Sequence, residues 1–576
     1  MDLLQQFVDF MNANVVEAGI PAGEERIPFM VLMLIGVGLL LTVRTGFVQI
    51  RHLGHGFAVA TGRYDDPDEP GDVTHFQALT TALSATVGIG NIAGVAIAIH
   101  WGGPGALFWM WVTAAVGMAT KFSEVTLAQR YRESVAADDP TAKQGSVSGG
   151  PMYYIEKGLG QKWKPMAIFF AVLLMFTSFL TGNAVQANTV ADTVQTSFGV
   201  PMWITGIVSA LVVGAVILGG ITRIGRVTSI LAPAMAAVYV AGALFIILMN
   251  AGEIVPAFSL IITEAFNPSA GIAGTGVGAF LVTLMWGVRR GLFSNEAGQG
   301  SAPIAHAAAK TDEPVSEGVV ALLEPFIDTI VICTMTAMVI IMTGVWSDTH
   351  PTEITLQGGD LSWVEYSESG RYSGIGAPEQ ITIIDGIQDV EALSTGLLAW
   401  HEVAVEELFV DEQQTRPFSG QINPATGIAI ATDGTEYTSL YGNAVESGAP
   451  LTLLGFQRGL PGSFGGGIVI LSVMLFAVST AISWSYYGDR CAYYLFGPRA
   501  ILPFKAIFVL MHFFGAVVPL AVVWSLGDIA LAIVIIPNLI ALLFLSGQVR
   551  EMTQSYFERR PWETQPGAVT KAGSGD

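Results

Sequence analysis

Charged residues are scarce in this chain of 576 residues. They make up 13% of it, whereas hydrophobic residues make up 52% and the mean hydropathy is +0.55. A soluble globular chain carries about 25% charged residues. The composition therefore excludes an ordinary soluble globular protein.

Cysteine is also rare, with only Cys333 and Cys491 in the chain. Both lie in or beside apolar segments, which excludes a disulfide framework and favours a packing role. The residues before the first apolar segment lack the basic region of a signal peptide, so we expect no cleavage there. No Ser/His/Asp set, phosphate-cradling loop or Cys/His metal spacing stands out, which gives an enzyme little support.

Long apolar runs are abundant. About 20 apolar residues span a hydrocarbon core of about 30 Å. We expect eleven transmembrane helices, at 27–43, 78–99, 104–128, 166–190, 202–220, 228–250, 272–290, 318–345, 463–487, 506–524 and 528–547.

Basic residues are distributed unevenly over the loops between these runs. One alternating set of loops, with the C-terminal tail, holds 21 of the 26 Lys and Arg residues, and the other set holds 4. Positively charged loops resist translocation, so the basic side should face the cytoplasm. The sequence predicts a multi-pass protein of the cell membrane, with its N-terminus outside and its C-terminus in the cytoplasm.

One loop, residues 346–462, is much longer than the others and strongly acidic. It holds 17 Asp and Glu against 3 Arg, which supplies −14 of the net charge of −21. Within it, Thr426–Thr438 alternates around an Asp-Gly turn, a pattern typical of a β-hairpin. We expect an extracellular domain. Its acidity fits either a surface adapted to a salty medium or an antechamber that concentrates cations.

These features divide the chain into five parts. We expect an external segment 1–26, transmembrane helices one to eight in 27–345, the insertion 346–462, helices nine to eleven in 463–547, and a cytoplasmic tail 548–576.

Glycine interrupts two of the apolar runs. Val87-Gly-Ile-Gly-Asn-Ile-Ala-Gly94 holds three glycines in a run where each costs about 1 kcal/mol of helix propensity. Thr283-Leu-Met-Trp-Gly-Val-Arg-Arg-Gly291 is a similar interruption in the seventh run. In transporters, such a pair in two inverted halves points to the binding site. Alternatively, the glycines only allow close helix packing, since Gly90 and Gly94 have the small-xxx-small spacing.

Seven blocks in order along the chain resemble the alanine or glycine:cation symporter family. They are Thr86-Val-Gly-Ile-Gly-Asn-Ile-Ala-Gly-Val95, Gly102-Gly-Pro-Gly-Ala-Leu-Phe-Trp-Met-Trp111, Met118-Ala-Thr-Lys-Phe-Ser-Glu124, Gly149-Gly-Pro-Met-Tyr-Tyr154, Arg290-Gly-Leu-Phe-Ser-Asn-Glu-Ala-Gly298, Glu324-Pro-Phe-Ile-Asp-Thr329 and Ser483-Trp-Ser-Tyr-Tyr-Gly-Asp-Arg490. The 346–462 insertion departs from the family's pattern, because it is longer than the usual loop.

The resemblance implies an all-α polytopic membrane protein of the LeuT type. Its five-plus-five inverted repeat would have one extra N-terminal helix, and the acidic extracellular insertion would contain β-structure. The implied function is symport of alanine or glycine with sodium by alternating access, without catalysis. The implied partners are the small amino acid, Na⁺ and the lipid bilayer, with no nucleic acid and no cofactor besides the coupling ion, and the monomer would suffice.

The resemblance also implies a substrate site at the two interruptions. The amides of Ile89 and Gly90 would receive the carboxylate, while carbonyl groups at the second interruption would accept the ammonium group. The residues implied to line the site are Thr86, Gly88, Ile89, Gly90, Asn91, Asn183, Gln186, Trp286, Gly287, Thr480 and Trp484. Alternatively, Asn183 and Gln186 bond neighbouring helices and Trp484 is a packing residue.

Sodium is a hard cation that oxygen ligands suit best, by analogy with calcium and magnesium. The implied ligands are Ser84, Val87, Asn91, Thr283, Ser479 and Thr480. Taken singly, a Ser or Thr in a membrane helix more often bonds its own backbone.

Several ionisable residues remain inside the apolar runs, where such groups suggest function. Glu324 and Asp328 lie four residues apart on one face, and a pair between Lys121 and Asp328 is conceivable. Ion pairing or gating at the cytoplasmic end is favoured over a proton relay. No other potential metal ligand stands near His306 in the sequence. We expect neighbouring groups to satisfy the hydrogen bonds of its imidazole ring.

Two other functions remain open, a channel and a sensor that uses 346–462 as its ligand domain. The sequence leaves the coupling ion open between sodium and protons, and the substrate between D- and L-alanine.

Overall fold

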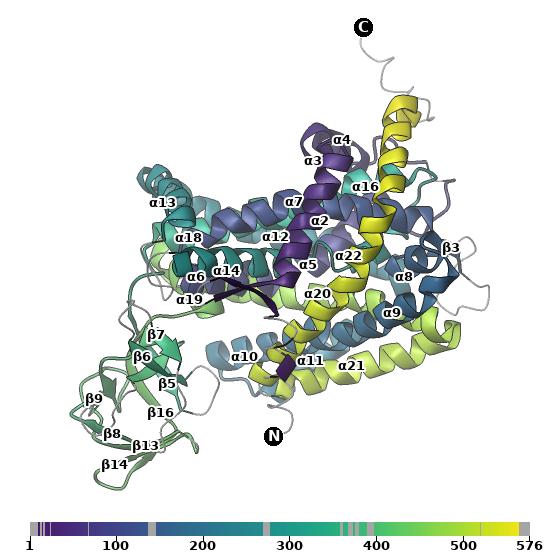
Figure 1. The fold of residues 1–576 in the computed structure, drawn as a ribbon. Helices are drawn as coiled ribbons and strands as arrows, with labels where there is room; N and C mark the ends of the chain where they lie inside the picture. Colours follow the sequence, from purple (N-terminus) through teal and green to yellow (C-terminus); the bar gives the residue numbers. More distant parts are fainter. Residues whose placement is uncertain are drawn as a thin grey trace.

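The computed structural model describes residues 10–563 except 12–13, 15–17, 23–24, 67, 136–145, 269–276, 357–360, 367–371, 375–379, 389–396, 402, 425 and 519. Helices form one body, and the strands of the insertion form a separate lobe at one end of it (Figure 1). The C-terminal end of the chain and helices α3 and α4 lie at the opposite end of the body from this lobe (Figure 1).

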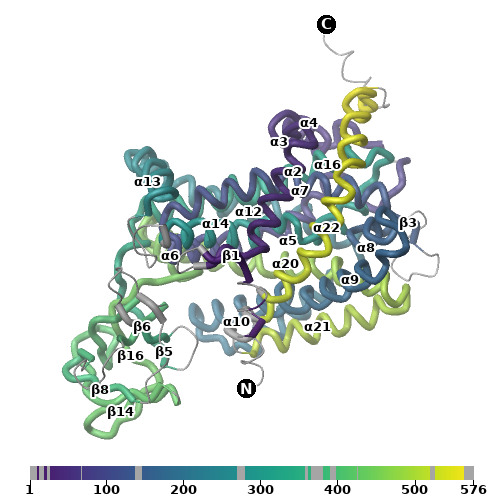
Figure 2. Tube along the Cα trace, viewed as in Figure 1, coloured from purple at the N-terminus to yellow at the C-terminus, as the bar shows by residue number. Residues whose placement is uncertain are grey.

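The long helices of the body lie on the apolar runs of the sequence, whereas several shorter helices lie between those runs. The helices are α2 Phe29–Arg44, α3 Val48–Arg51, α4 Leu53–Ala60, α5 His75–Thr86, α6 Val95–Gly102, α7 Ala106–Arg130, α8 Pro151–Tyr153, α9 Lys164–Phe179, α10 Val185–Phe198, α11 Met202–Ile217, α12 Gly220–Met249, α13 Ile254–Phe266, α14 Val277–Asn295, α15 Ala302–His306, α16 Pro314–Ala321, α17 Leu323–Pro325, α18 Thr334–Met342, α19 Gly448–Gly459, α20 Phe464–Phe496, α21 Ile501–Val517 and α22 Leu520–Arg559. The shorter helices between the apolar runs are α3, α4, α8, α13, α15 and α19. The first long helix α2 packs beside the last helix α22 (Figure 2).

Within the described residues, six continuous helical segments are long and apolar enough to cross a membrane. They are Gln161–Phe198, Gly220–Met249, Pro314–Met342, Phe464–Phe496, Pro498–Val517 and Ile529–Glu563. The bent pair α5 and α6 makes a seventh, and α2 and α11 are shorter apolar helices. The protein is thus a multi-pass membrane protein, and the count of eleven spans stays a prediction.

The first predicted interruption is confirmed as a break in the helix. Helix α5 ends at Thr86, and a π-helical turn at Gly90–Gly94 leads into α6, with a bend of 55° between the two halves. The side-chain oxygen of Asn91 accepts the backbone N–H of Gly88 at 2.8 Å. This bond replaces a helical partner, so the opened backbone stays satisfied although it is buried.

The second predicted interruption, at Thr283–Gly291, is wrong, because α14 runs through it without a break. Gly287 instead allows close packing, since a Cβ there would lie 2.4 Å from the carbonyl oxygen of Ala106 on α7. The chain leaves the helix one turn later, where Glu296 has a φ of 55° and Gly298 and Gly300 have φ of 90° and 77°. Helix α15 begins at Ala302. The second break thus lies at Glu296–Ser301.

Short antiparallel sheets make up the lobe. Their strands are β5 His350–Thr355, β6 Leu361–Tyr366, β7 Tyr372–Gly374, β8 Ile381–Ile384, β9 Ile387–Gln388, β10 Leu397–Trp400, β11 Val403–Ala404, β12 Leu408–Phe409, β13 Gly420–Asn423, β14 Ile428–Ala431, β15 Glu436–Tyr437 and β16 Ser439–Ala444. Strands β14 and β15 pair on either side of the Asp433-Gly434 turn, as expected of a hairpin. Two further short pairs lie outside the lobe, β1 Gly19–Ala22 with β2 Glu25–Pro28 and β3 Glu133–Ser134 with β4 Val147–Ser148.

Candidate functional site

Both helix breaks open onto one small cavity inside the helical body. Its volume is about 20 Å³, which holds about one water molecule. Its lining residues come from five helical regions and are Ala85, Thr86, Gly88, Ile89, Gly90, Thr181, Gln186, Phe293, Glu296, Gln299, Thr480, Trp484 and Leu531. An amino acid is larger than this cavity, so its binding has to move at least one lining side chain.

A cluster of oxygen atoms lies beside the cavity, where α5 crosses α20. The Oγ1 of Thr480 and the Oγ of Ser479 donate to the carbonyl oxygen of Ser84 at 3.2 and 3.3 Å. The Oγ of Ser84 donates in return to the carbonyl oxygen of Ser479 at 3.2 Å. A Cβ on Gly88 would lie 2.8 Å from the Thr480 hydroxyl, so glycine lets the opened backbone approach it. These neutral oxygens have the chemistry that a hard monovalent cation requires.

Asn91 holds the first break rather than facing this oxygen cluster. Besides accepting from Gly88, its side-chain nitrogen donates to Oδ1 of Asp328 at 2.6 Å and to the hydroxyl of Ser294 at 3.0 Å. Asp328 Oδ2 also accepts from Ser294 at 2.6 Å and from Thr329 at 2.7 Å. The buried carboxylate thus ties the first break to α14 and to the π-helical segment Phe326–Cys333.

The π-helical turn Leu180–Ala184 and helix α10, which follows it, supply one wall of the cavity through Thr181 and Gln186. Gln186 donates to the carbonyl oxygen of Thr181 at 3.1 Å, and its own Oε1 is buried without a hydrogen-bond partner among the described residues. Asn183 does not line the cavity. It donates to the carbonyl oxygen of Phe508 at 2.8 Å and contacts His512 at 2.6 Å, both on α21, so it makes the interhelical bonds of the alternative interpretation.

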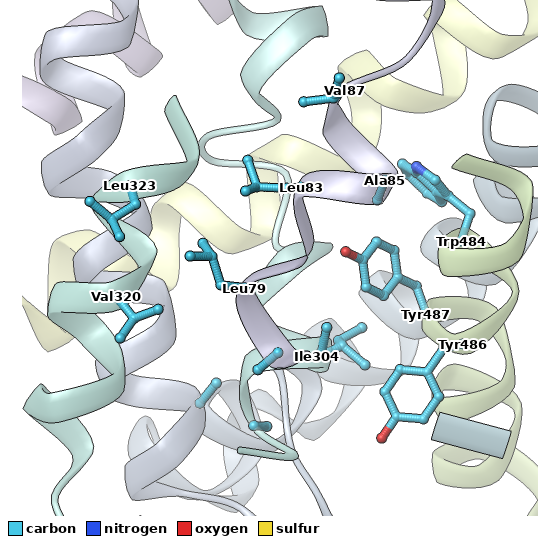
Figure 3. Close-up of a cluster of buried hydrophobic side chains, with 14 of the residues drawn as sticks. Leu79, Leu83, Ala85, Val87, Ile304, Val320, Leu323, Trp484, Tyr486 and Tyr487 are labelled. Carbon is cyan, nitrogen blue, oxygen red and sulfur yellow. The ribbon is translucent and has the colours of Figure 1, made fainter. Parts of the chain in front are cut away.

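Trp484 covers the cavity from α20 and points toward Ala85 on α5 (Figure 3). Its indole N–H donates to Oε1 of Glu296 at 3.1 Å, while the hydroxyl of Ser301 donates to the other oxygen at 2.5 Å. A Cβ on Gly182 would lie 2.4 Å from the indole ring, so a glycine makes room for the tryptophan.

Sequence reasoning missed the lining residues Glu296 and Gln299. The available signal was Asn295-Glu-Ala-Gly-Gln-Gly-Ser301, which places an acid and two glycines directly after an apolar run. Phe293, Thr181 and Leu531 were also missed, because apolar or weakly polar residues in a membrane helix carry no such signal. They are lining residues by virtue of packing alone.

Three residues expected at the second break lie elsewhere. Thr283 donates to the carbonyl oxygen of Gly102 at 2.8 Å, and Gly287 packs on α7. Trp286 stacks on Trp101 with ring centroids 5.6 Å apart and lines a neighbouring cavity of about 120 Å³. None of the three lines the cavity at the breaks.

The proposed pair of Lys121 with Asp328 is also wrong. The ammonium group of Lys121 lies 3.2 Å from Glu324 instead, and both side chains are fully buried. Glu324 lies one helical turn before Asp328, in the short helix α17. Because α17 packs against α7, Glu324 rather than Asp328 lies beside Lys121 of α7. His306 contacts the same carboxylate at 2.8 Å, so neighbouring groups satisfy it, as expected.

The family model and the relatives that match this chain point to one and the same family. The model of the sodium:alanine symporter family matches residues 10–362 and 421–570. The sodium/alanine symporter AgcS of Methanococcus maripaludis is 40% identical over 92% of this chain and 95% of that relative. A putative sodium/proton-dependent alanine carrier protein, YrbD of Bacillus subtilis, is 32% identical over 90% of this chain and 87% of its own length.

An uncharacterized transporter of Haemophilus influenzae is 35% identical over 92% of this chain and 93% of its own. Among solved structures, MhsT in complex with L-phenylalanine aligns with 84% of this chain and 99% of that chain, at 10% identity and a TM-score of 0.46. This likeness is too distant to decide the fold.

Proposed function

Since the chain belongs to the sodium:alanine symporter family, we propose that it takes up alanine or glycine by coupling their entry to an inward flux of sodium. The observation that carries this proposal is the meeting of two helix breaks and an oxygen cluster at one buried cavity. Such a site serves a zwitterion and a cation together.

The substrate carboxylate would bind at the first break. The half-helix that begins at Gly90 starts at the cavity, so the N–H groups of its first turn and the positive end of its dipole would face the substrate. We assign the carboxylate to the amides of Ile89 and Gly90, with Thr86 and Gly88 beside them. This arrangement needs no charged side chain for the anionic end of the substrate.

The substrate ammonium group would bind on the opposite wall. The second break brings Glu296 and Gln299 to the cavity, and Gln186 offers an oxygen that has no partner among the described residues. Oxygen acceptors are what an ammonium group requires, since it has three donors and no acceptor. We therefore assign the ammonium group to the carboxylate of Glu296, in place of the backbone carbonyl groups near Trp286 and Gly287 that the family resemblance implied.

Sodium would occupy the oxygen cluster of α5 and α20. We assign it the hydroxyls of Ser479 and Thr480 and the backbone oxygens of Ser84 and Val87, which need only small shifts to turn toward an ion. Asn91 would act indirectly, by holding the break open next to the ion.

We also propose the membrane orientation and the fold. The end of the body that carries α3, α4 and the C-terminal end of α22 would face the cytoplasm, because these basic segments belong to the basic side of the chain, and the acidic lobe would face outward. The two breaks would correspond in a LeuT-type five-plus-five inverted repeat that works as a monomer.

Uptake into proteoliposomes tests the function. With an inward sodium gradient, radiolabelled alanine should accumulate above its outside concentration, and the accumulation should collapse when sodium is equal on both sides. Equal uptake with potassium or choline in place of sodium, at fixed pH, refutes sodium coupling. Equilibration without accumulation indicates a channel, and binding without uptake indicates a sensor.

A further inference from the structure

Two buried histidines and two buried glutamates form a continuous chain that the proposed substrate and sodium sites do not use. Nδ1 of His75 contacts one carboxylate oxygen of Glu317, and Nδ1 of His306 contacts the other. Nε2 of His306 lies 2.8 Å from Glu324, which lies 3.2 Å from Lys121. The chain thus joins α5, α16, α15, α17 and α7 through side chains that can all gain or lose a proton.

The outer end of this chain meets water. Nε2 of His75 lies 4.0 Å from Asp65, which follows α4 in the chain and whose side chain is 34% exposed. The side chains from His75 to Lys121 are at most 3% exposed. A proton can therefore enter or leave the chain at the Asp65 end.

Charge balance requires the chain to hold a proton. With Glu317 and Glu324 ionised, Lys121 offsets one negative charge, and a buried unpaired charge costs several kcal/mol. One imidazole has to be protonated to neutralise the rest. Glu317 bridges both rings, so the proton can reside on His75 or His306 with only a short transfer along existing hydrogen bonds.

Other charged groups face the chain from the packed elements. Glu69 and Arg132 lie near His75 and Glu317, and Glu124 and Glu296 lie near Lys121. Arg132 is engaged by the carbonyl oxygens of Ala307 and Ala309, at 3.0 and 2.7 Å. Arg132 keeps its positive charge in these bonds and so offsets one negative charge, whereas Glu69, Glu124 and Glu296 add up to three, so the neighbouring groups do not remove the demand for a bound proton.

The chain connects the two broken helices. His75 lies on the first turn of α5, which ends at the first break, and His306 ends α15, which follows the second break. A movement of α5 about its break would separate His75 from Glu317 and change the charge that the chain can hold.

We propose that this chain is a proton-exchange site whose occupancy changes when the half-helices move around the substrate. Bulk water supplies the proton, an imidazole nitrogen gains it, and the chain gains one positive charge; release to water through Asp65 reverses the step. The inference rests on the proposed transport function and adds proton linkage to it, because a site that binds protons differently in two states is coupled to whatever shifts those states.

Calorimetry of alanine binding in two buffers with different ionisation enthalpies tests the proposal. At saturating sodium and near the ordinary pKa of histidine, the heat should differ between phosphate and Tris, which reveals a fraction of a proton exchanged per alanine bound. His306→Gln should still bind alanine but lose this buffer dependence. Asp65→Asn, at a partly exposed site that tolerates change, should slow proton exchange measured with a pH dye.

The matched control is His512→Gln, a buried histidine of α21 that contacts Asn183 and no carboxylate among the described residues. It should keep the wild-type buffer dependence. Equal heats in both buffers for the wild-type protein, or an unchanged difference in His306→Gln, overturn the proton site and leave the transport proposal standing. If alanine does not bind at all, the transport proposal fails, and the same comparison with sodium as the titrant decides the inference.

Discussion

The indole N–H of Trp484 donates to the carboxylate of Glu296 at 3.1 Å, across the cavity where the two helix breaks meet. This bond fixes a bulky ring from α20 against the second break. Since the cavity is too small for an amino acid, at least one lining side chain has to move when substrate binds, and the indole of Trp484 is the largest of them. The contact therefore governs both the size of the site and access to its acid.

Trp484→Ala should widen the range of substrates. Removing the indole enlarges the cavity, so leucine should compete with alanine for sodium-dependent uptake. Truncation of a buried tryptophan costs about 3–5 kcal/mol, so the variant has to be checked by thermal unfolding. Trp484→Phe separates the two roles, because it keeps most of the bulk and loses the bond to Glu296. An unchanged substrate profile in a folded Trp484→Ala protein contradicts the size-limiting role.

The two helix breaks show what could be predicted from the sequence. The first break lies where glycines interrupt an apolar run, and local propensity was enough to locate it. The second was misplaced because Gly287 looks like a helix breaker but serves close packing on α7, which depends on a distant segment. From the sequence alone, a glycine in an apolar run can either break the helix or allow another helix to pack closely against it, and the sequence does not distinguish the two.

The partners of the buried acids were harder to predict for the same reason. Asp328 accepts a hydrogen bond from Asn91, which lies 237 positions away in the chain. Lys121 pairs with Glu324 and not with Asp328, although both acids lie on one helical face. Periodicity places side chains on a face but does not set the height at which another helix crosses it. The oxygen cluster could be anticipated only because the resemblance to a family supplied the pairing of α5 with α20.

Thr480→Val should weaken sodium binding. The change keeps the shape of the side chain and removes the hydroxyl that lies 3.2 Å from the carbonyl oxygen of Ser84. We expect the sodium concentration for half-maximal uptake to rise by about tenfold, equivalent to about 1.4 kcal/mol. Ser472→Ala is the matched control on the same helix, because its buried hydroxyl has no hydrogen-bond partner among the described residues. An unaltered sodium dependence in Thr480→Val removes this threonine from the cation site.

The acidic lobe should be dispensable for coupling, provided that α19 is kept. Helix α19 contacts the first broken helix, since Thr452 donates to the carbonyl oxygen of Ile92 at 2.9 Å. The lobe residue His401 contacts the far end of α6, where its carbonyl oxygen lies 3.1 Å from Nε2 of His100. Replacing 350–444 with a short Gly/Ser linker should retain sodium-driven uptake in proteoliposomes.

A longer replacement through 458, which removes most of α19, should abolish uptake. The comparison separates loss of the lobe from loss of a helix that supports the break. Failure of the shorter replacement, with normal membrane insertion and a monodisperse purified protein, would mean that the lobe gates or feeds the pathway.

Gly90 should tolerate bulk poorly, because the opened backbone rather than a side chain is expected to hold the substrate carboxylate. A Cβ at Gly90 would lie 3.1 Å from the ring of Phe293 and 3.4 Å from Cα of Ser294, so the two γ-methyl groups of valine have to intrude further into the cavity or its wall. Valine also stiffens the backbone at the break. Gly90→Val should therefore lower alanine affinity by on the order of a hundredfold, about 2.7 kcal/mol.

Gly94→Ala is the control within the same π-helical turn. The nearest atom to a Cβ there is Cδ of Arg290 at 3.9 Å, so one methyl group fits without displacement, and Gly94 does not line the cavity. Its alanine affinity should stay near that of the wild type. Calorimetry on the purified, monodisperse proteins measures both affinities directly. Near-native affinity in Gly90→Val would show that the carboxylate binds elsewhere.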